Sequence, residues 1–287
     1  MPASPTVDAW FDPATHTITY LVSDPATGAA TIIDPVLDFD APAARTSTAS
    51  IDRVLAAVAA RGLTLTHVLD THAHADHLSG ADEIRVRTGV PVGIGARITR
   101  VQKTFGDLFE AADVTPDGAA FDQLYADGDR FTLGSLEVEV MHTPGHTPAC
   151  VSYRIGDAVF VGDTLFMPDY GTARCDFPGG DARTLWRSIQ KILALPDDTR
   201  VFTGHDYLPE GRTDFRWEST VAEQKRANIH VVGRTEDEFV TMREARDAAL
   251  KPPQLILPSL QINIRAGALP PPEPSGRRFL KAPLNAI

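Results

Sequence analysis

The feature that most constrains the fold of this chain is a cluster of potential metal ligands directly after an apolar strand. The buried-strand pattern LTHVLD runs straight into THAHADHLSG at residues 71–80. Side chains two positions apart at the end of a strand point the same way, so His72 and His74 can converge on one point. Asp76 and His77 follow as the chain turns into a helix. This dense group of imidazoles and one carboxylate indicates a metal ion bound by nitrogen and oxygen.

Three further segments repeat the same geometry, in which an apolar strand ends and a potential ligand follows. VEVMHTPGHT places His146 after a Pro-Gly turn, AVFVGDT places Asp163 after a glycine, and VFTGHDY does the same for His205. Each glycine permits tight turning of the backbone beside the site. A chance histidine cluster on a polar surface does not explain four such strand ends in one chain. We therefore expect all of these side chains to share one metal site.

The strands are arranged as hairpins rather than as a simple parallel series. Residues 16–22 and 30–34 are two β-rich runs joined by a turn, and strand pairs are also expected within 131–145 and 151–163. Helices are expected at 50–62, 79–87, 184–195, 217–228 and 236–250, and further strands at 65–70, 90–94 and 200–206. The stretch 38–50, rich in alanine, proline, serine and threonine, is expected to be a loop. Hairpins argue against a purely parallel sheet, so two mixed sheets with helices on their outer faces fit best.

Composition narrows the classes of function. The chain has 287 residues and a formal net charge of −11, which argues against binding to nucleic acid or to a membrane surface. A small anionic substrate would need only a local group of arginine or lysine side chains. No apolar run approaches a membrane span, no signal peptide is visible at the N-terminus, and the two cysteines cannot build a disulfide framework. We therefore expect a cytoplasmic protein.

The order HxHxDH, TPGHT, GDT and GHD resembles the metallo-β-lactamase superfamily over roughly residues 7–265. The resemblance implies an α/β fold, the αββα sandwich of two mixed β-sheets flanked by helices, with the metal at the sheet edges. It also implies one catalytic domain at 1–268, followed by a Pro-rich C-terminal tail at 269–287.

Three branches of this superfamily deserve comparison. A secreted β-lactamase needs an export signal, which is not visible here. The thiolester hydrolases of the glyoxalase II type and the persulfide dioxygenases share the histidine motifs. However, YGTARCDFPGGDARTLWRSI (170–189), GHDY (204–207) and NIRAG (263–267) resemble the dioxygenases. Compared with the mitochondrial type, the sequence is longer around 38–50, around 96–127 and after 268, which indicates a longer bacterial subgroup.

The dioxygenase resemblance implies one Fe(II) per chain, held by His72, His146 and Asp163. Two imidazoles and one carboxylate leave positions open on the metal, and the implied reaction oxidises glutathione persulfide with O2 and water to sulfite and glutathione. Outer groups would then be His74, Asp76, His77, His205 and Asp206. The alternative is a glyoxalase II-like thiolester hydrolase with two Zn ions, in which Asp163 bridges the metals. The residues alone leave both geometries open.

Substrate contacts are expected from basic and aromatic side chains near these motifs. Arg174 in ARCDF is expected to bind a glutathione carboxylate or to hold the site loop, and Tyr207 to hydrogen-bond the substrate or a metal-bound oxygen. Lys251 and Arg265 are weaker candidates, for which an ordinary solvated side chain is an equally good interpretation. Cys175 has no adjacent base and is better explained as a small residue packed in the loop.

Several remaining features carry no catalytic assignment. A structural zinc module without enzymatic activity is disfavoured, because such sites are usually closed and rich in cysteine. Homodimers are common in the family, and the residues themselves do not fix the oligomeric state. The histidines outside the ligand pattern are interpreted as ordinary packed or surface residues: His16, His67, His142 and His230.

Overall fold

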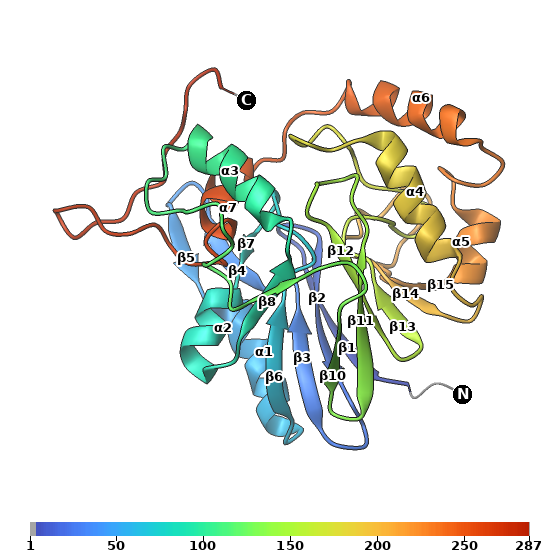
Figure 1. The fold of residues 1–287 in the computed structure, drawn as a ribbon, viewed down its shortest axis with the longest axis horizontal. Helices are drawn as coiled ribbons and strands as arrows, with labels where there is room; N and C mark the ends of the chain where they lie inside the picture. The colour runs from blue at the N-terminus through green and yellow to red at the C-terminus, as the bar shows by residue number, and fades with distance from the viewer. Residues whose placement is uncertain (1–3, 287) are drawn as a thin grey trace.

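The computed structural model describes residues 4–286, which form two six-stranded sheets with helices on both outer faces (Figure 1). The strands are β1 (Thr6–Asp12), β2 (Thr17–Ser23), β3 (Ala29–Ile33), β4 (Val36–Asp40), β5 (Arg45–Ser47), β6 (Thr64–Leu69), β7 (Leu78–Ser79), β8 (Val92–Gly95), β9 (Gln123–Tyr125), β10 (Arg130–Leu133), β11 (Leu136–His142), β12 (Val151–Ile155), β13 (Ala158–Phe160), β14 (Arg200–Phe202) and β15 (Glu218–Thr220). The helices are α1 (Ala49–Ala60), α2 (Ala81–Thr88), α3 (Ile98–Leu108), α4 (Ala182–Leu193), α5 (Val221–Ala227), α6 (Glu236–Asp247) and α7 (Ile256–Asn263).

Both large sheets are mixed, as the hairpin pattern predicts. The first has the order β1-β2-β3-β6-β8-β9, in which β1, β2 and β3 are antiparallel and the remaining neighbours are parallel. The second has the order β10-β11-β12-β13-β14-β15 and contains one parallel pair, β13 with β14. The hairpins expected around 16–34, 131–145 and 151–163 are confirmed as β2–β3, β10–β11 and β12–β13.

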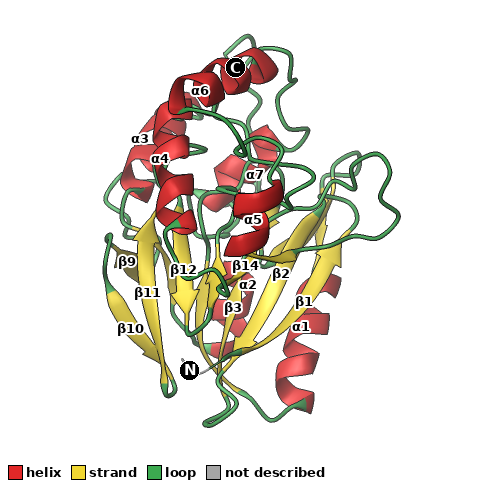
Figure 2. Ribbon diagram, turned by 90° about the vertical axis from the view of Figure 1, so that its right-hand side faces the viewer, coloured by secondary structure: helices red, strands yellow, loops and turns green. Residues whose placement is uncertain are grey.

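Three apolar clusters hold the layers together. One lies between the two sheets and includes Tyr20, Leu69, Val138 and Phe160. A second lies between the first sheet and its helices, and a third packs α4 and α6 against the second sheet. Figure 2 shows the two sheets with helices outside them. This arrangement is the predicted αββα sandwich, because each sheet buries one face on the other sheet and one face under helices.

The loop predicted at 38–50 is wrong. This stretch contains most of β4 and all of β5, which form a hairpin, and β4 also pairs with β7. Phe39 packs against the cluster under the first sheet. Strand pairing and this packing outweigh a local composition that favours a loop.

The helix predicted at 217–228 is correct only in its later part. Residues 218–220 form strand β15 against β14, and the helix begins at Val221. Thr220 caps it in extended conformation, forming a capping box with Glu223. Sequence reasoning also missed β1, β9, α3 and α7.

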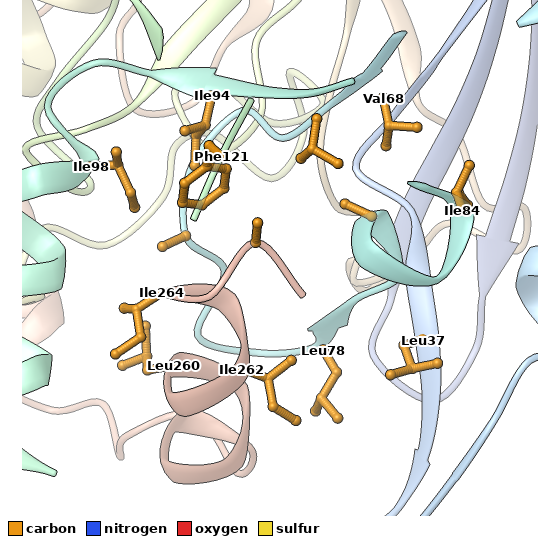
Figure 3. Close-up of a cluster of buried hydrophobic side chains, with 14 of the residues drawn as sticks. Leu37, Val68, Leu78, Ile84, Ile94, Ile98, Phe121, Leu260, Ile262 and Ile264 are labelled. Carbon is orange, nitrogen blue, oxygen red and sulfur yellow. The ribbon is translucent and has the colours of Figure 1, made fainter. Parts of the chain in front are cut away.

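Helix α7 connects the end of the chain to the histidine loop. Figure 3 shows Ile262 next to Leu78, which lies just after that loop, and Leu260 and Ile264 belong to the same apolar cluster. After α7, residues 268–286 contain no helix or strand. The division into a catalytic domain and a tail stays a prediction.

Candidate metal centre

The polar side chains predicted to share a site come together at one edge of the sandwich. Three compact sets of ligand atoms lie here, each with all three atoms within 4.8 Å of one another, and the third, Asp34, Asp70 and His74, shares its histidine with the second. The first set is His72, His146 and Asp163, and the second is His74, Asp76 and His205. His77 completes the group, with its ring centroid 4.2 Å from that of His74. Asp163 lies between the sets, with Oδ2 3.6 Å from His146 Nε2 and Oδ1 3.4 Å from His205 Nε2.

The ends of four strands deliver these ligands. The loop after β6 carries the HxHxDH motif, and the segments after β11, β13 and β14 carry His146, Asp163 and His205. The two sheets are tied together here, because Ile18 N donates to Gly204 O at 2.9 Å. A Cβ added at Gly204 would lie 2.7 Å from Asp163 Oδ1. Glycine is therefore needed there to let the β14 end approach the carboxylate.

Each histidine in the site forms a hydrogen-bond contact with another protein group through one ring nitrogen. The other ring nitrogen is left without such a contact. The bonded nitrogens and their partners are His72 Nδ1 with Thr71 Oγ1 (3.1 Å), His74 Nε2 with Asp34 (3.0 Å), His77 Nδ1 with Asp76 (3.0 Å) and Thr17 Oγ1 (3.2 Å), His146 Nδ1 with the Arg174 carbonyl (2.8 Å), and His205 Nδ1 with the His16 carbonyl (3.2 Å). Such contacts fix the orientation of an imidazole that binds a metal.

The remaining atoms fit a metal ion. Buried polar atoms without a hydrogen-bond partner are rare in proteins and require an explanation. Five of them face one another here: His72 Nε2, His74 Nδ1, His77 Nε2, His205 Nε2 and Asp163 Oδ1. Nitrogen and oxygen donors of this kind suit zinc or iron. A metal ion at the first ligand set would give partners to His72 and Asp163, and one at the second set would do so for His74 and His205.

The electrostatics differ across the site. Burial, reinforced by neighbouring imidazoles, lowers the pKa of His72 and His74 well below the usual histidine value. These rings are therefore neutral, which is the form that binds metal. Burial also opposes protonation of His205, but the carboxylates of Asp163 and Asp76 outweigh it and raise the pKa of His205 to about 10.

Sequence reasoning missed three residues that support the ligands. Asp34 is buried and accepts bonds from Thr71 N and Thr71 Oγ1 as well as contacting His74. It follows the apolar strand ATII, so the strand-end pattern that located the other ligands could have located Asp34. Thr17 and the carbonyl of His16 offered no such signal, because the fold alone brings the β1–β2 turn against the site. His16 also lines the site cavity, so it is more than an ordinary packed residue.

A cavity of about 990 Å³ opens onto these ligands. Asp76, His146 and Asp163 line it, together with the predicted substrate residues Arg174 and Tyr207. The Tyr207 ring stacks on that of His205, with centroids 5.4 Å apart and planes 19° apart.

Other predicted site residues have different surroundings. Arg174 pairs with Asp176 through Nε at 2.5 Å, and its Nη1 donates to the Lys251 carbonyl at 2.7 Å. The side chain of Lys251 is not among those lining the cavity. Arg265 pairs with Asp113 instead of facing the cavity. Asp206 is buried and pairs with Arg212.

The loop that carries Arg174 is anchored from behind by α6. Arg243 and Asp247 are buried and pair at 2.6 Å. Arg243 donates to the Thr172 carbonyl at 3.2 Å, and Asp247 accepts from Cys175 N at 2.8 Å. Cys175 is itself buried, as expected for a packed loop residue. This ion pair therefore holds both sides of the residue whose carbonyl orients His146.

Asn263 in the terminal NIRAG segment clamps the histidine loop. Its Nδ2 donates to the carbonyls of His74 and His77, each at 2.8 Å, and its Oδ1 accepts from Ser79 N at 2.8 Å. Asn263 is buried. A side chain from the last helix thus fixes the backbone that bears four of the ligands.

Residues 13–205 match the metallo-beta-lactamase superfamily, and with this fold and site the chain belongs to that superfamily. It is similar to the beta-lactamase hydrolase-like protein of Agrobacterium fabrum, with 55% identity over 285 residues, or 99% of this chain. This chain spans only 66% of the length of that relative. Glyoxylase B2 of Dictyostelium discoideum is 49% identical, with 93% of this chain and 92% of that protein covered.

Two named activities also occur among the relatives. The mitochondrial persulfide dioxygenase of Bos taurus is 33% identical over 91% of this chain and 89% of its own length. The hydroxyacylglutathione hydrolase of Rhodospirillum rubrum is 36% identical over 66% of this chain and 61% of its own length. The crystal structure of ETHE1 from Myxococcus xanthus has a TM-score of 0.74 and 35% identity, covering 92% of this chain and all of that one.

The superfamily and the ligand cluster identify this chain as a metal-dependent enzyme. Within residues 4–286, no helix is both long and apolar enough to cross a membrane.

Proposed function

We propose that this chain is a cytoplasmic persulfide dioxygenase with one Fe(II), which oxidises glutathione persulfide. The observation that carries the proposal is the clamp of Asn263 on the histidine loop. Asn263 begins the terminal motif that the sequence shares with persulfide dioxygenases. Its side chain holds the loop that carries four of the ligands, and this contact of the motif with the metal site supports the proposal.

His72, His146 and Asp163 would hold the iron, because they form one compact set with free atoms. Bound there, Fe(II) would supply the redox chemistry by which O2 oxidises a sulfur atom. One persulfide, one O2 and one water give one thiol and one sulfite. The outer sulfur loses four electrons and its bond to the inner sulfur, O2 gains those four electrons, and water supplies the third oxygen of sulfite.

The protein's own residues position the substrate for this reaction. Tyr207 lies in the cavity against His205, and burial raises the pKa of its phenol well above the usual value, so it stays a hydrogen-bond donor. Arg174 belongs to both the cavity and the metal site, because the residue lines the cavity and its backbone carbonyl contacts His146 Nδ1. Contact of Arg174, Tyr207 or Lys251 with the substrate stays a prediction.

The glyoxalase II-like thiolester hydrolase is the second candidate. The second ligand set, His74, Asp76 and His205, favours it, since a hydrolase of this kind uses two metal ions. The 49% identity to a protein named glyoxylase B2 also supports it. Against it, the named hydroxyacylglutathione hydrolase aligns with only 66% of this chain, and the named dioxygenase with 91%.

The test measures metal and turnover together. Protein purified without oxygen is analysed for metal, then assayed with fresh glutathione persulfide on an oxygen electrode and with S-lactoylglutathione for hydrolysis. We expect one iron per chain, oxygen uptake, and little thiolester turnover. Two zinc ions with rapid thiolester hydrolysis and no oxygen uptake would establish the hydrolase instead.

A further inference from the structure

The cavity extends well beyond the metal ligands, and its two sides differ in charge. The charged residues that helix α6 and the loop before α4 contribute to the lining are all positive: Arg174, Arg243 and Arg246. The β4–β5 hairpin contributes both signs: Asp38, Asp40 and Arg45. Figure 1 shows β4 and β5 on one side of the molecule and α6 on the other. A ligand in this cavity would therefore meet two chemically different ends.

Only some of these arginine side chains are without an ion-pair partner. Arg174 is committed to Asp176, and Arg243 to Asp247. By contrast, Arg45 and Arg246 form neither an ion pair nor a side-chain hydrogen bond with any residue in 4–286. The charge of Arg246 does reach the cavity, because it counteracts the burial that raises the pKa of Tyr170. In a chain of net charge −11, two unpaired cations in one cavity are local attractors for an anion.

The acidic side chains of the hairpin are also unequal. Both oxygens of Asp38 are occupied, by Ser50 N at 2.9 Å and Ser50 Oγ at 2.7 Å. Asp40 accepts only from Ala43 N, at 3.2 Å. Asp40 and Arg45 are direct partners across the two strands. The hairpin thus presents one carboxylate and one guanidinium side by side, which matches the ammonium and carboxylate of an α-amino acid.

We propose that the Asp40–Arg45 pair binds the α-amino-acid end of a peptide thiol and that Arg246 binds the carboxylate at its other end. The inference rests on the proposed function, because it orients the substrate with its sulfur toward the metal between these two contacts. Glutathione has both ends: its γ-glutamyl group is an α-amino acid, and its glycine ends in a lone carboxylate.

The test measures binding without turnover. Reduced glutathione, glutathione esterified at the glycine carboxylate, and cysteinylglycine are titrated by calorimetry into the metal-loaded protein without oxygen. Arg246→Gln should weaken glutathione binding about tenfold and leave binding of the ester unchanged, because the ester already lacks the paired charge. Arg45→Gln should weaken glutathione and the ester about tenfold and leave cysteinylglycine unchanged. Arg226→Gln is the control, since Arg226 is exposed on α5 and does not line the cavity.

Two results would overturn the assignment. If Arg45→Gln and Arg246→Gln behave like Arg226→Gln, the two arginines are solvated charges without a ligand. If each variant weakens all three ligands equally, the effect is general attraction and not recognition of separate ends. Oxygen uptake without the expected binding pattern would remove this assignment alone. The binding pattern without oxygen uptake would refute the dioxygenase and retain the two contacts.

Discussion

The two ligand sets use the same kinds of side chain, but the protein prepares them differently. His72, His146 and Asp163 are all buried, and burial holds the pKa of His72 well below the usual value, so that ring is neutral. The second set contains Asp76, whose side chain is 21% exposed, and His205, whose pKa is raised to about 10. His72 in the first set is therefore in the form that binds a metal ion at neutral pH, whereas His205 in the second set must lose a proton first. Similar ligands can thus differ in affinity through their surroundings alone.

The largest expected effect separates the two sets directly. Asp163→Ala should lower affinity for the first metal ion by more than 100-fold, because loss of a ligand exceeds the 10- to 100-fold cost of losing an outer contact. Asp76→Ala is the matched variant and should retain the first ion while losing any second one. Metal content after dialysis and oxygen uptake measure both. If the two variants lost equal amounts of metal, the two ligand sets would act as one site.

The anchor behind His146 should affect the first set alone. Asp247→Ala leaves Arg243 buried without its partner and frees Cys175 N, and breaking a buried pair typically costs 3–5 kcal/mol. We expect lower stability in denaturant unfolding and roughly tenfold weaker binding of the first ion. Asp237→Ala, on the exposed side of the same helix, is the control for general effects on α6. Unchanged metal affinity in a folded Asp247→Ala protein would show that the loop needs no anchor.

Binding of a second ion should depend on pH. His205 must release its proton to bind metal, so apparent affinity should fall about tenfold for each unit by which pH drops below about 10. Binding of the first ion should change much less between pH 7 and 9. Zinc titrations at several pH values measure both. A second ion that binds equally well at pH 7 and 9 would contradict the difference between the sets.

The proton on His205 should also affect the stability of the metal-free protein. The pKa of His205 is raised on folding from about 6.5 to about 10, so its stabilising contribution is complete below 6.5 and is lost as pH rises through 10. We expect the metal-free protein to lose up to a few kcal/mol of unfolding free energy over this window. Denaturant unfolding at pH 6.5 and 9.5 checks this, with His205→Gln as the variant that should lose the dependence. A wild-type protein equally stable at both values would contradict it.

The smallest expected effect concerns Thr17, whose hydroxyl lies 3.2 Å from both His77 Nδ1 and Asp76 Oδ2. Thr17→Val keeps the shape and removes that hydrogen bond, which is worth about 1 kcal/mol. Binding of a second ion should weaken about fivefold, and binding of the first should not change. Competition with a chelator resolves a change of this size. An equal loss of metal affinity at both ligand sets would contradict the idea that Thr17 supports only the second set.

The strand-end pattern explains why the ligand cluster could be predicted. A strand fixes the direction of its side chains, so a polar residue directly after it, such as His205 or Asp163, has a predictable place. The supports of these ligands could be predicted less well. Thr17 and the carbonyl of His16 reach the site only because the two sheets meet at the β2 end. A backbone carbonyl also leaves no mark in the sequence.

The errors in the fold have a related cause. The β4–β5 hairpin is stabilised by its pairing with β7 and by Phe39, and both depend on partners that are distant in the sequence. Helix α7 was missed because its proline and its weak amphipathic pattern give little local signal. NIRAG was recognised by resemblance, but its action on the histidine loop depends on contacts across 186 to 189 positions.

That distance has a consequence for synthesis of the chain. The loop from His72 to His77 leaves the ribosome long before α7 has been translated, and until then its carbonyls lack the amide of Asn263. The ligands therefore reach their final geometry only after Asn263 has emerged and packed against the loop. Metal capture by the finished geometry consequently comes late in the synthesis of this domain, and a nascent chain stalled before Asn263 should present a looser set of imidazoles.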